Sequence, residues 1–288
     1  MKFCRYDNDR LGIVQGNEVL DVTPALSEIP QQRWPVAPGD PLIVHWDRVS
    51  KAIAALLPSA PRRPLASVKL LAPVPNPTKI VNAPINYADH IAESAKDPTI
   101  SAGRTNLTHI SDWGLFLKAN SALIGFGEEI KLRFPDRRND FECELAVVIG
   151  KTANKVPADK ALDYVFGYAI GLDMTLRGKE LQCFRKSIDS YAVMGPWVVT
   201  RDEIPDPNAL ELKLSQNGVL RQDNNTKYLV YNVQKLIEYA SSFYTLHPGD
   251  FFFTGTPAGV GPVKPGDTLT PYIQGVGEGN VKIAPQYY

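Results

Sequence analysis

The sequence has few of the residues that most often bind zinc. Its 288 residues include only four histidines and three cysteines. Cys4, Cys143 and Cys183 are far apart along the chain and offer no zinc-binding spacing. A low, odd number of scattered cysteines is typical of proteins in a reducing compartment. We therefore expect a soluble cytoplasmic protein without a cysteine-based zinc site.

The sequence also lacks an excess of charge and any long apolar run. Lys plus Arg and Asp plus Glu both number 31, so no global field would attract nucleic acid or an anionic membrane. No apolar run approaches the roughly 18 residues that a membrane-spanning helix needs. The charged N-terminus, MKFCRYDNDRLG, does not resemble a signal peptide. The composition thus predicts neither nucleic-acid nor membrane partners.

Proline is abundant in one segment and predicts a boundary there. Six prolines lie between Pro58 and Pro77, a density that excludes the interior of a helix and indicates a connector. Before it, residues 11–23 read as a hairpin with a Gly-Asn turn, and residues 47–57 have helical composition. We predict a small N-terminal α+β domain over residues 1–70 and a larger domain over residues 71–288.

The larger domain is rich in short, strand-like segments. Apolar or alternating runs, separated by Gly, Pro and Asp, predict strands near residues 79–84, 144–150, 164–173, 191–200, 210–220, 250–255 and 267–277. One amphipathic helix is expected from Val233 to Phe243, where apolar residues follow a 3.6-residue period. These patterns predict a mainly β, α+β fold of barrel or roll type.

Two glutamates stand at the start of an apolar run in the segment NDFECELAVVIGK. Side chains alternate along a strand, so Glu142 and Glu144 would share one face, roughly 7 Å apart, opposite Phe141 and Cys143. Two carboxylates near a core repel each other and need a cation, a proton or access to water. A solvated strand end is the simpler interpretation of such a pair.

A third acid, Asp173, ends the strand-like run over residues 164–173. If that strand lies beside the first, Glu142, Glu144 and Asp173 would meet and offer three hard oxygen ligands. Such a set suits Mg²⁺ or Mn²⁺ better than zinc or copper. The alternative for Asp173 is a side chain that caps a turn.

Among the histidines, only His90 has a suggestive neighbour. In NYADHIAES, His90 and Glu93 are three residues apart and would share one face of a helix. A carboxylate that orients a histidine is a common arrangement for a general base, although a surface pair looks the same. His45, His109 and His247 have no comparable partner, and we interpret them as structural or surface residues.

Two further segments could contact an anion. Arg185 and Lys186 follow the Asp173 strand and could stabilise an enolate or oxyanion, unless they are solvated surface charges. The segment FFFTGTPAGVG is a Gly-rich turn whose N–H groups could hold a carboxylate. Because it lacks the Lys-Ser/Thr ending of a P-loop, nucleotide binding is disfavoured.

Several of these segments, in this order, resemble successive signatures of the fumarylacetoacetate hydrolase family. The similarity runs from about residue 72 to 280 and rests on KIVNAPINYADHIAE, FLKANSALIGFGEEI, DFECELAVVIGK, GYAIGLDMTLR, RKSIDSYAVMGPWVVT and GDFFFTGTPAGVGPVKPGD. The resemblance implies a rolled mixed β-structure around a metal ion, with an accessory N-terminal domain, usually in a homodimer.

The resemblance also implies roles for individual residues. Metal ligands would be Glu142, Glu144 and Asp173, for Mg²⁺ or in some members Mn²⁺ or Ca²⁺. The water-activating dyad of a mobile lid would be His90 with Glu93, and the active-site lysine would be Lys186. Thr256 would contact the substrate carboxylate, and Lys118 would border the site.

The sequence departs from the family pattern in two places. Many members have Arg-Asp-Leu-Gln after the aspartate strand, with a Gln that touches substrate. Here DMTLRGKELQ keeps Arg177 but places the Gln two positions late, at Gln182. The 22 residues between Glu93 and Phe116 are also longer than the usual lid connection, which can change the distal group that is accepted.

Members of the family cleave or rearrange 2-oxo acids that carry a second carbonyl. We therefore predict a metal-dependent hydrolase that cleaves a C–C bond in a 2,4-dioxo acid of acylpyruvate or fumarylpyruvate type, in aromatic compound catabolism. An oxaloacetate-type decarboxylase and a hydroxymuconate-type isomerase or hydratase are the nearest alternatives. A non-catalytic binding protein is a further one, although no ligand or dyad residue is lost.

Overall fold

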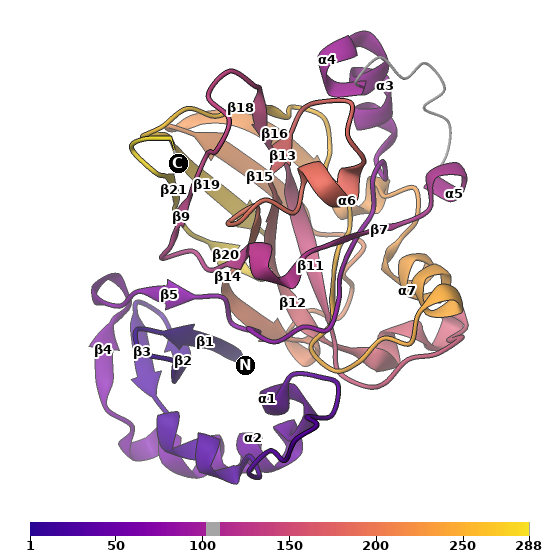
Figure 1. The fold of residues 1–288 in the computed structure, drawn as a ribbon. Coiled ribbons are helices and arrows are strands. Elements are labelled where there is room, and N and C mark those ends of the chain that lie inside the picture. Colours follow the sequence, from indigo (N-terminus) through magenta and orange to yellow (C-terminus); the bar gives the residue numbers. More distant parts are fainter. Residues whose placement is uncertain (102–109, 288) are drawn as a thin grey trace.

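The computed structural model describes residues 1–101 and 110–287. Twelve strands of this part of the chain form the largest sheet (Figure 1). In sheet order they are β4 (Arg62–Pro64), β3 (Glu18–Asp21), β2 (Arg10–Gln15), β1 (Lys2–Tyr6), β14 (Ala192–Thr200), β12 (Val165–Asp173), β11 (Cys143–Ile149), β17 (Phe251–Phe253), β6 (Ile80–Asn82) and β7 (Phe116–Lys118), with β5 (Leu70–Leu71) on β1 and β8 (Leu123–Ile124) on β14.

Two smaller sheets complete the β-structure of the described residues. The six-stranded sheet contains β16 (Val219–Asn225), β15 (Glu211–Gln216), β19 (Thr268–Ile273), β21 (Val281–Ile283) and β9 (Glu129–Ile130), with β20 (Gly277–Glu278) on β19. The three-stranded sheet contains β13 (Thr175–Leu176), β10 (Asn139–Phe141) and β18 (Gly261–Pro262). This arrangement confirms the predicted mainly β, α+β class.

The helices are short and flank the sheets. They are α1 (Pro41–Val44), α2 (Trp46–Leu56), α3 (Ala88–Lys96), α4 (Pro98–Ser101), α5 (Ile110–Trp113), α6 (Gln182–Arg185) and α7 (Val233–Phe243). The helices predicted near residues 47–57 and over residues 233–243 are confirmed by α2 and α7. Within the described ranges, no helix combines the length and the apolar composition that crossing a membrane requires.

The N-terminal segment lies at one side of the molecule and continues the large sheet (Figure 1). The predicted hairpin is formed by β2 and β3, which join through the Gly16-Asn17 turn. Strand β1 pairs with β14, with Phe3 opposite Val198. Hydrogen bonds of one sheet therefore cross the predicted boundary at residue 70, and the division into two domains stays a prediction.

The central strands β11, β12 and β14 are buried along their whole length. On β11, Leu145 and Val147 belong to one apolar cluster, and Ala146 and Val148 to the cluster on the opposite face. A strand covered on both faces reads as a continuous apolar run. Glu144 shares the face of Ala146 and Val148, so the alternation of the strand directs its carboxylate to that side.

Asp250 joins the starts of two parallel strands, β17 and β6. Its side chain is fully buried. Its Oδ1 accepts the backbone N–H groups of Thr78 (2.7 Å) and Lys79 (2.8 Å), and its Oδ2 accepts that of His247 (2.8 Å). Because buried N–H groups are costly to leave without an acceptor, this carboxylate holds together segments that are about 170 residues apart.

We expect Asp250→Ala to lower the free energy of unfolding by about 3 kcal/mol, because it removes the acceptor of several buried donors. Asp163→Ala is the matched control: Asp163 is exposed and lies 3.5 Å from Arg201, and such surface pairs contribute about 0.5 kcal/mol. Urea unfolding curves measure both. Equal stability of the two variants would contradict the structural role of Asp250.

Candidate active site

Three carboxylates converge where β11 and β12 lie side by side. Strand pairing places Cys143 opposite Leu172, and the N–H of Asp173 donates to the carbonyl of Glu142 at 2.9 Å. One carboxylate oxygen from each of Glu142, Glu144 and Asp173 lies within 4.8 Å of the others. The predicted meeting of the three acids is therefore confirmed, and all three are buried. A set of three carboxylates is suited to a hard divalent cation.

Two buried lysines reach the same acids. The Nζ of Lys186 donates to Glu142 Oε2 at 2.7 Å and to Asp173 Oδ2 at 2.6 Å. The Nζ of Lys118, at the end of β7, donates to Asp173 Oδ1 and to the carbonyl of Tyr191. Lys118, which the resemblance placed at the border of the site, thus lies directly against one of its acids.

Arg177 is the third cation of the site. One guanidinium nitrogen lies 2.9 Å from Glu142 Oε1, and Nε donates to Asp140 Oδ2 at 2.8 Å. Asp140 is fully buried and also accepts from Arg138. Asp140 was not predicted as a site residue, although it lies two residues before Glu142 and so follows the same alternation that selected Glu144.

The surroundings shift the pKa values of Glu144 and Glu142 in opposite directions. Burial is the main influence on Glu144 and raises its pKa well above the ordinary value, and the charges of Asp173 and Glu142 raise it further. Burial would also raise the pKa of Glu142, but the nearby cations Lys186 and Arg177 outweigh it and hold that pKa low. Glu144 is thus the carboxylate that needs a proton or an added cation.

The pKa values of the two lysines also shift in opposite directions. Burial lowers the pKa of Lys118, an effect that the charge of Asp173 only partly offsets. For Lys186, the opposing charges of Asp173 and Glu142 outweigh burial, and the pKa is raised. Lys186 is therefore held as a cation between two carboxylates, and its Nζ also lies 5.1 Å from the ring centroid of Phe116.

The predicted histidine dyad forms on helix α3. His90 Nδ1 and Glu93 Oε2 are 2.9 Å apart, and the other oxygen of Glu93 accepts the N–H of Gly259 at 2.9 Å. His90 is only 4% exposed, which argues against a simple surface pair. The Gly-rich segment after β17 therefore fixes the carboxylate, and the carboxylate fixes the imidazole.

One cavity of about 40 Å³ is lined by His90 of the dyad and by Glu142 of the three converging acids. Its lining includes His90, Glu142, Arg177, Gln182 and Lys186. Gln182 lines the cavity despite its displaced position in the sequence. Because this volume holds only a few water molecules, a larger molecule enters only if part of the lining moves.

Thr256 lies outside the lining of this cavity. Its hydroxyl donates to the carbonyl of Cys143 at 2.9 Å and accepts from Gln222 Nε2 at 2.8 Å. Gln222 also accepts the N–H of Cys143 at 3.0 Å. The two side chains together hold the backbone between Glu142 and Glu144, a role that the sequence alone did not indicate.

The remaining histidines lie elsewhere. His45 lies between α1 and α2, and the backbone N–H of His247 donates to Asp250. His109 lies outside the residues that the structure describes. Neither His45 nor His247 lines the cavity.

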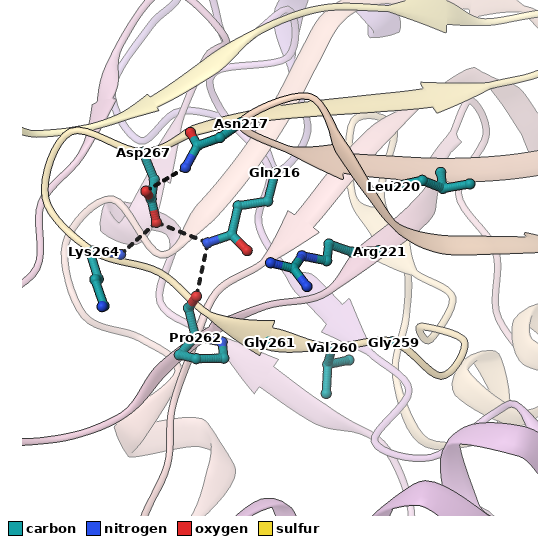
Figure 2. Close-up of a pocket in the computed structure, with 10 residues that line it drawn as sticks. All are labelled: Gln216, Asn217, Leu220, Arg221, Gly259, Val260, Gly261, Pro262, Lys264 and Asp267. Carbon is teal, nitrogen blue, oxygen red and sulfur yellow. Dashed lines mark hydrogen bonds between the residues drawn. The ribbon is translucent and has the colours of Figure 1, made fainter.

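A larger pocket of 680 Å³ lies at the β15–β16 hairpin, between Gln216, Arg221 and the segment from Gly259 to Asp267 (Figure 2). Its acid, Asp267, accepts from Asn217, Gln216 and the backbone of Lys264. That carboxylate holds the β15–β16 hairpin to the loop between β18 and β19. The pocket therefore lacks the group of acids that would make it a metal centre.

The chain is similar to proteins of a known family. Residues 79–284 match the family model described as fumarylacetoacetate (FAA) hydrolase C-terminal. The chain is 54% identical to a maleylpyruvate hydrolase of Aquipseudomonas alcaligenes over 98% of its own length and 99% of that protein.

Solved structures agree as well. A maleylpyruvate hydrolase from Sphingobium sp. SYK-6 superposes with a TM-score of 0.84 and 41% identity, over 99% of both chains. A second structure of that enzyme, in complex with manganese(II) and pyruvate, gives a TM-score of 0.83 and 40% identity over the same shares. The chain therefore belongs to the fumarylacetoacetate hydrolase family.

Proposed function

We propose that the protein is a metal-dependent hydrolase that cleaves a C–C bond in an acylpyruvate, a 2,4-dioxo acid, during the breakdown of aromatic compounds. The observation that carries this proposal is the single cavity that His90 shares with Glu142 and Lys186. The proposed general base and one carboxylate of the acid cluster thus line the same space. The similarity to maleylpyruvate hydrolases supports the same reaction.

The metal ligands in this proposal are Glu142, Glu144 and Asp173. A divalent ion bound there, Mg²⁺ or Mn²⁺, with Ca²⁺ as a further alternative, would act as a Lewis acid toward the oxygens of a 2-oxo acid. The manganese in a related structure supports a divalent metal. The raised pKa of Glu144 fits this role, because an added cation favours the charged form of a carboxylate that burial disfavours.

His90 is the proposed general base. Its Nδ1 faces Glu93 at 2.9 Å, so the neutral ring that donates from Nδ1 keeps Nε2 free to accept a proton. A water molecule in the cavity would lose a proton to Nε2 and attack the distal carbonyl carbon. Glu93 holds the imidazole in this orientation and stabilises its charge once it is protonated.

Lys186 and Arg177 would oppose the negative charge that develops when the C–C bond breaks and pyruvate leaves as its enolate. Both are buried and already directed toward Glu142, so they need little rearrangement. Contacts of Lys118, Arg177, Gln182 and Thr256 with the substrate stay predictions. The structure supports Lys118 and Thr256 most directly as residues that hold Asp173 and Cys143 in place.

The charge around the site supports an anionic substrate. Four buried acids and four buried bases of the described residues surround it: Asp140, Glu142, Glu144 and Asp173, and Lys118, Arg177, Arg185 and Lys186. With all of them ionised, these charges cancel. A divalent cation would add positive charge to these eight groups, which favours an anionic substrate.

Oxaloacetate decarboxylation and isomerisation need the same acids but no activated water. The complete His90–Glu93 dyad is the feature that favours hydrolysis over these alternatives and over a non-catalytic binding protein. We also propose a homodimer and a cytoplasmic location. Both rest on the family resemblance and the composition.

Metal binding tests the ligand assignment. We expect Glu144→Gln to weaken Mn²⁺ and Mg²⁺ binding by about 10²-fold or more, since changes outside the ligand set alone can cost 10–100-fold. The metal-free variant should melt no lower than the metal-free wild type, because glutamine replaces a carboxylate whose charge burial disfavours. Calorimetry and thermal melts in the presence of a chelator measure the two effects.

Glu142→Gln is the informative comparison. It should also lose metal affinity, but its metal-free form should melt lower, because Lys186 and Arg177 lose a buried counter-charge. Glu180→Gln, at an acid that pairs with Arg137, serves as the control with normal metal affinity. Wild-type Mn²⁺ affinity in Glu144→Gln would refute the assignment.

His90→Ala should lower kcat for acylpyruvate hydrolysis by about 10²–10⁴-fold, the usual contribution of a general base. Metal affinity should stay normal, because His90 is not among the converging acids. Glu93→Gln should have a smaller effect, since it weakens the orientation of the ring without removing the base. Steady-state kinetics at saturating Mn²⁺ gives these values, and a wild-type rate in His90→Ala would show that His90 is not the base.

The oligomeric state is testable directly. We expect light scattering at micromolar concentration to give at least twice the 31.8 kDa of one chain. A mass of one chain would refute the proposed homodimer.

A further inference from the structure

Part of the cavity lining has no role in the proposed chemistry. Besides His90 and Glu142, the residues that line the cavity include Ser94, Ser101 and Arg185. Base catalysis and stabilisation of the enolate are already assigned to other residues. A guanidinium and two hydroxyls around one space are instead suited to bind a carboxylate.

Arg185 ends the short helix α6 and is 6% exposed. Its Nη1 donates to the carbonyl of Leu176 at 3.0 Å, which fixes the guanidinium beside the cavity. The next residue, Lys186, sends its ammonium to Glu142 and Asp173. The two neighbouring side chains therefore have different partners: Arg185 binds the carbonyl of Leu176, and Lys186 binds the acids.

The two serines come from the helices that cover the cavity. Ser94 follows His90 by four residues on α3, which places both side chains on one face of the helix. Ser94 is 3% exposed. Ser101 ends the adjoining helix α4. Figure 1 shows α3 and α4 together at one corner of the molecule, and the shared cavity brings them against α6.

We propose that Arg185, Ser94 and Ser101 bind the distal carboxylate of the substrate and so select 2,4-dioxo acids whose acyl group ends in a second carboxylate. This inference rests on the proposed acylpyruvate hydrolysis and adds the specificity of the same site. Because Arg185 belongs to α6 and the serines to α3 and α4, a bound carboxylate bridges the two sides of the cavity. Its binding therefore favours the closed position that brings His90 to the substrate.

The test compares two substrates in the manganese-loaded enzyme: maleylpyruvate, which has a distal carboxylate, and acetylpyruvate, which has none. Arg185→Met should lower kcat/KM for maleylpyruvate by about 10²-fold, the usual result of removing one partner of a buried charged pair. The decrease for acetylpyruvate should be at least tenfold smaller. The kcat/KM of Arg185→Lys for maleylpyruvate should lie between the values of the wild type and Arg185→Met, because lysine keeps the charge and loses the planar fork.

Ser94→Ala is a second test of the carboxylate site, and it does not depend on whether the arginine variants fold. It should lower kcat/KM for maleylpyruvate by about 3–10-fold, as expected for one hydrogen bond, with a smaller effect on acetylpyruvate. Equal losses on both substrates in Arg185→Met and Ser94→Ala would overturn the inference and leave the proposed hydrolase intact. A wild-type enzyme that hydrolyses neither substrate would refute the proposed function, and the carboxylate site with it.

Discussion

The structure depends on the balance of charge in one buried group of side chains. Glu142, Glu144 and Asp173 lie within 4.8 Å of one another away from water, and three carboxylates so placed repel strongly. The lysines Lys118 and Lys186 offset part of this repulsion. Burial, and then the charges of Asp173 and Glu142, still raise the pKa of Glu144, so an added cation would favour its charged form.

That imbalance connects the fold to the proposed reaction. The central strands are buried on both faces, so the acids are held rigidly and cannot relax by moving apart. A site of this kind favours an added cation because the carboxylates that would bind it are already desolvated in the folded protein. Arg177, which is bound to both Glu142 and Asp140, extends the same network toward the cavity.

The segment that carries His90 has the opposite character, since it is built from the short helices α3 and α4. Helix α3 carries His90, and the contact of Glu93 with the N–H of Gly259 fastens it to the segment after β17. Asn224 also donates to Asp89 of this helix at 2.6 Å, and hydrogen bonds of this kind each contribute only about 1 kcal/mol. Under the proposed function, such contacts would let α3 open to admit substrate and close to place the base.

The sequence by itself determined the central strands, the two longest helices and the three acids Glu142, Glu144 and Asp173. Period-two alternation selected Glu142 and Glu144, and the helical spacing selected His90 with Glu93, because these patterns are local consequences of backbone geometry. Only the tertiary structure decided which cation meets which acid, that Asp140 orients Arg177 and that Gln222 holds Cys143. Those contacts join segments many residues apart, and side chains that meet through strand pairing leave no periodic signal in the sequence.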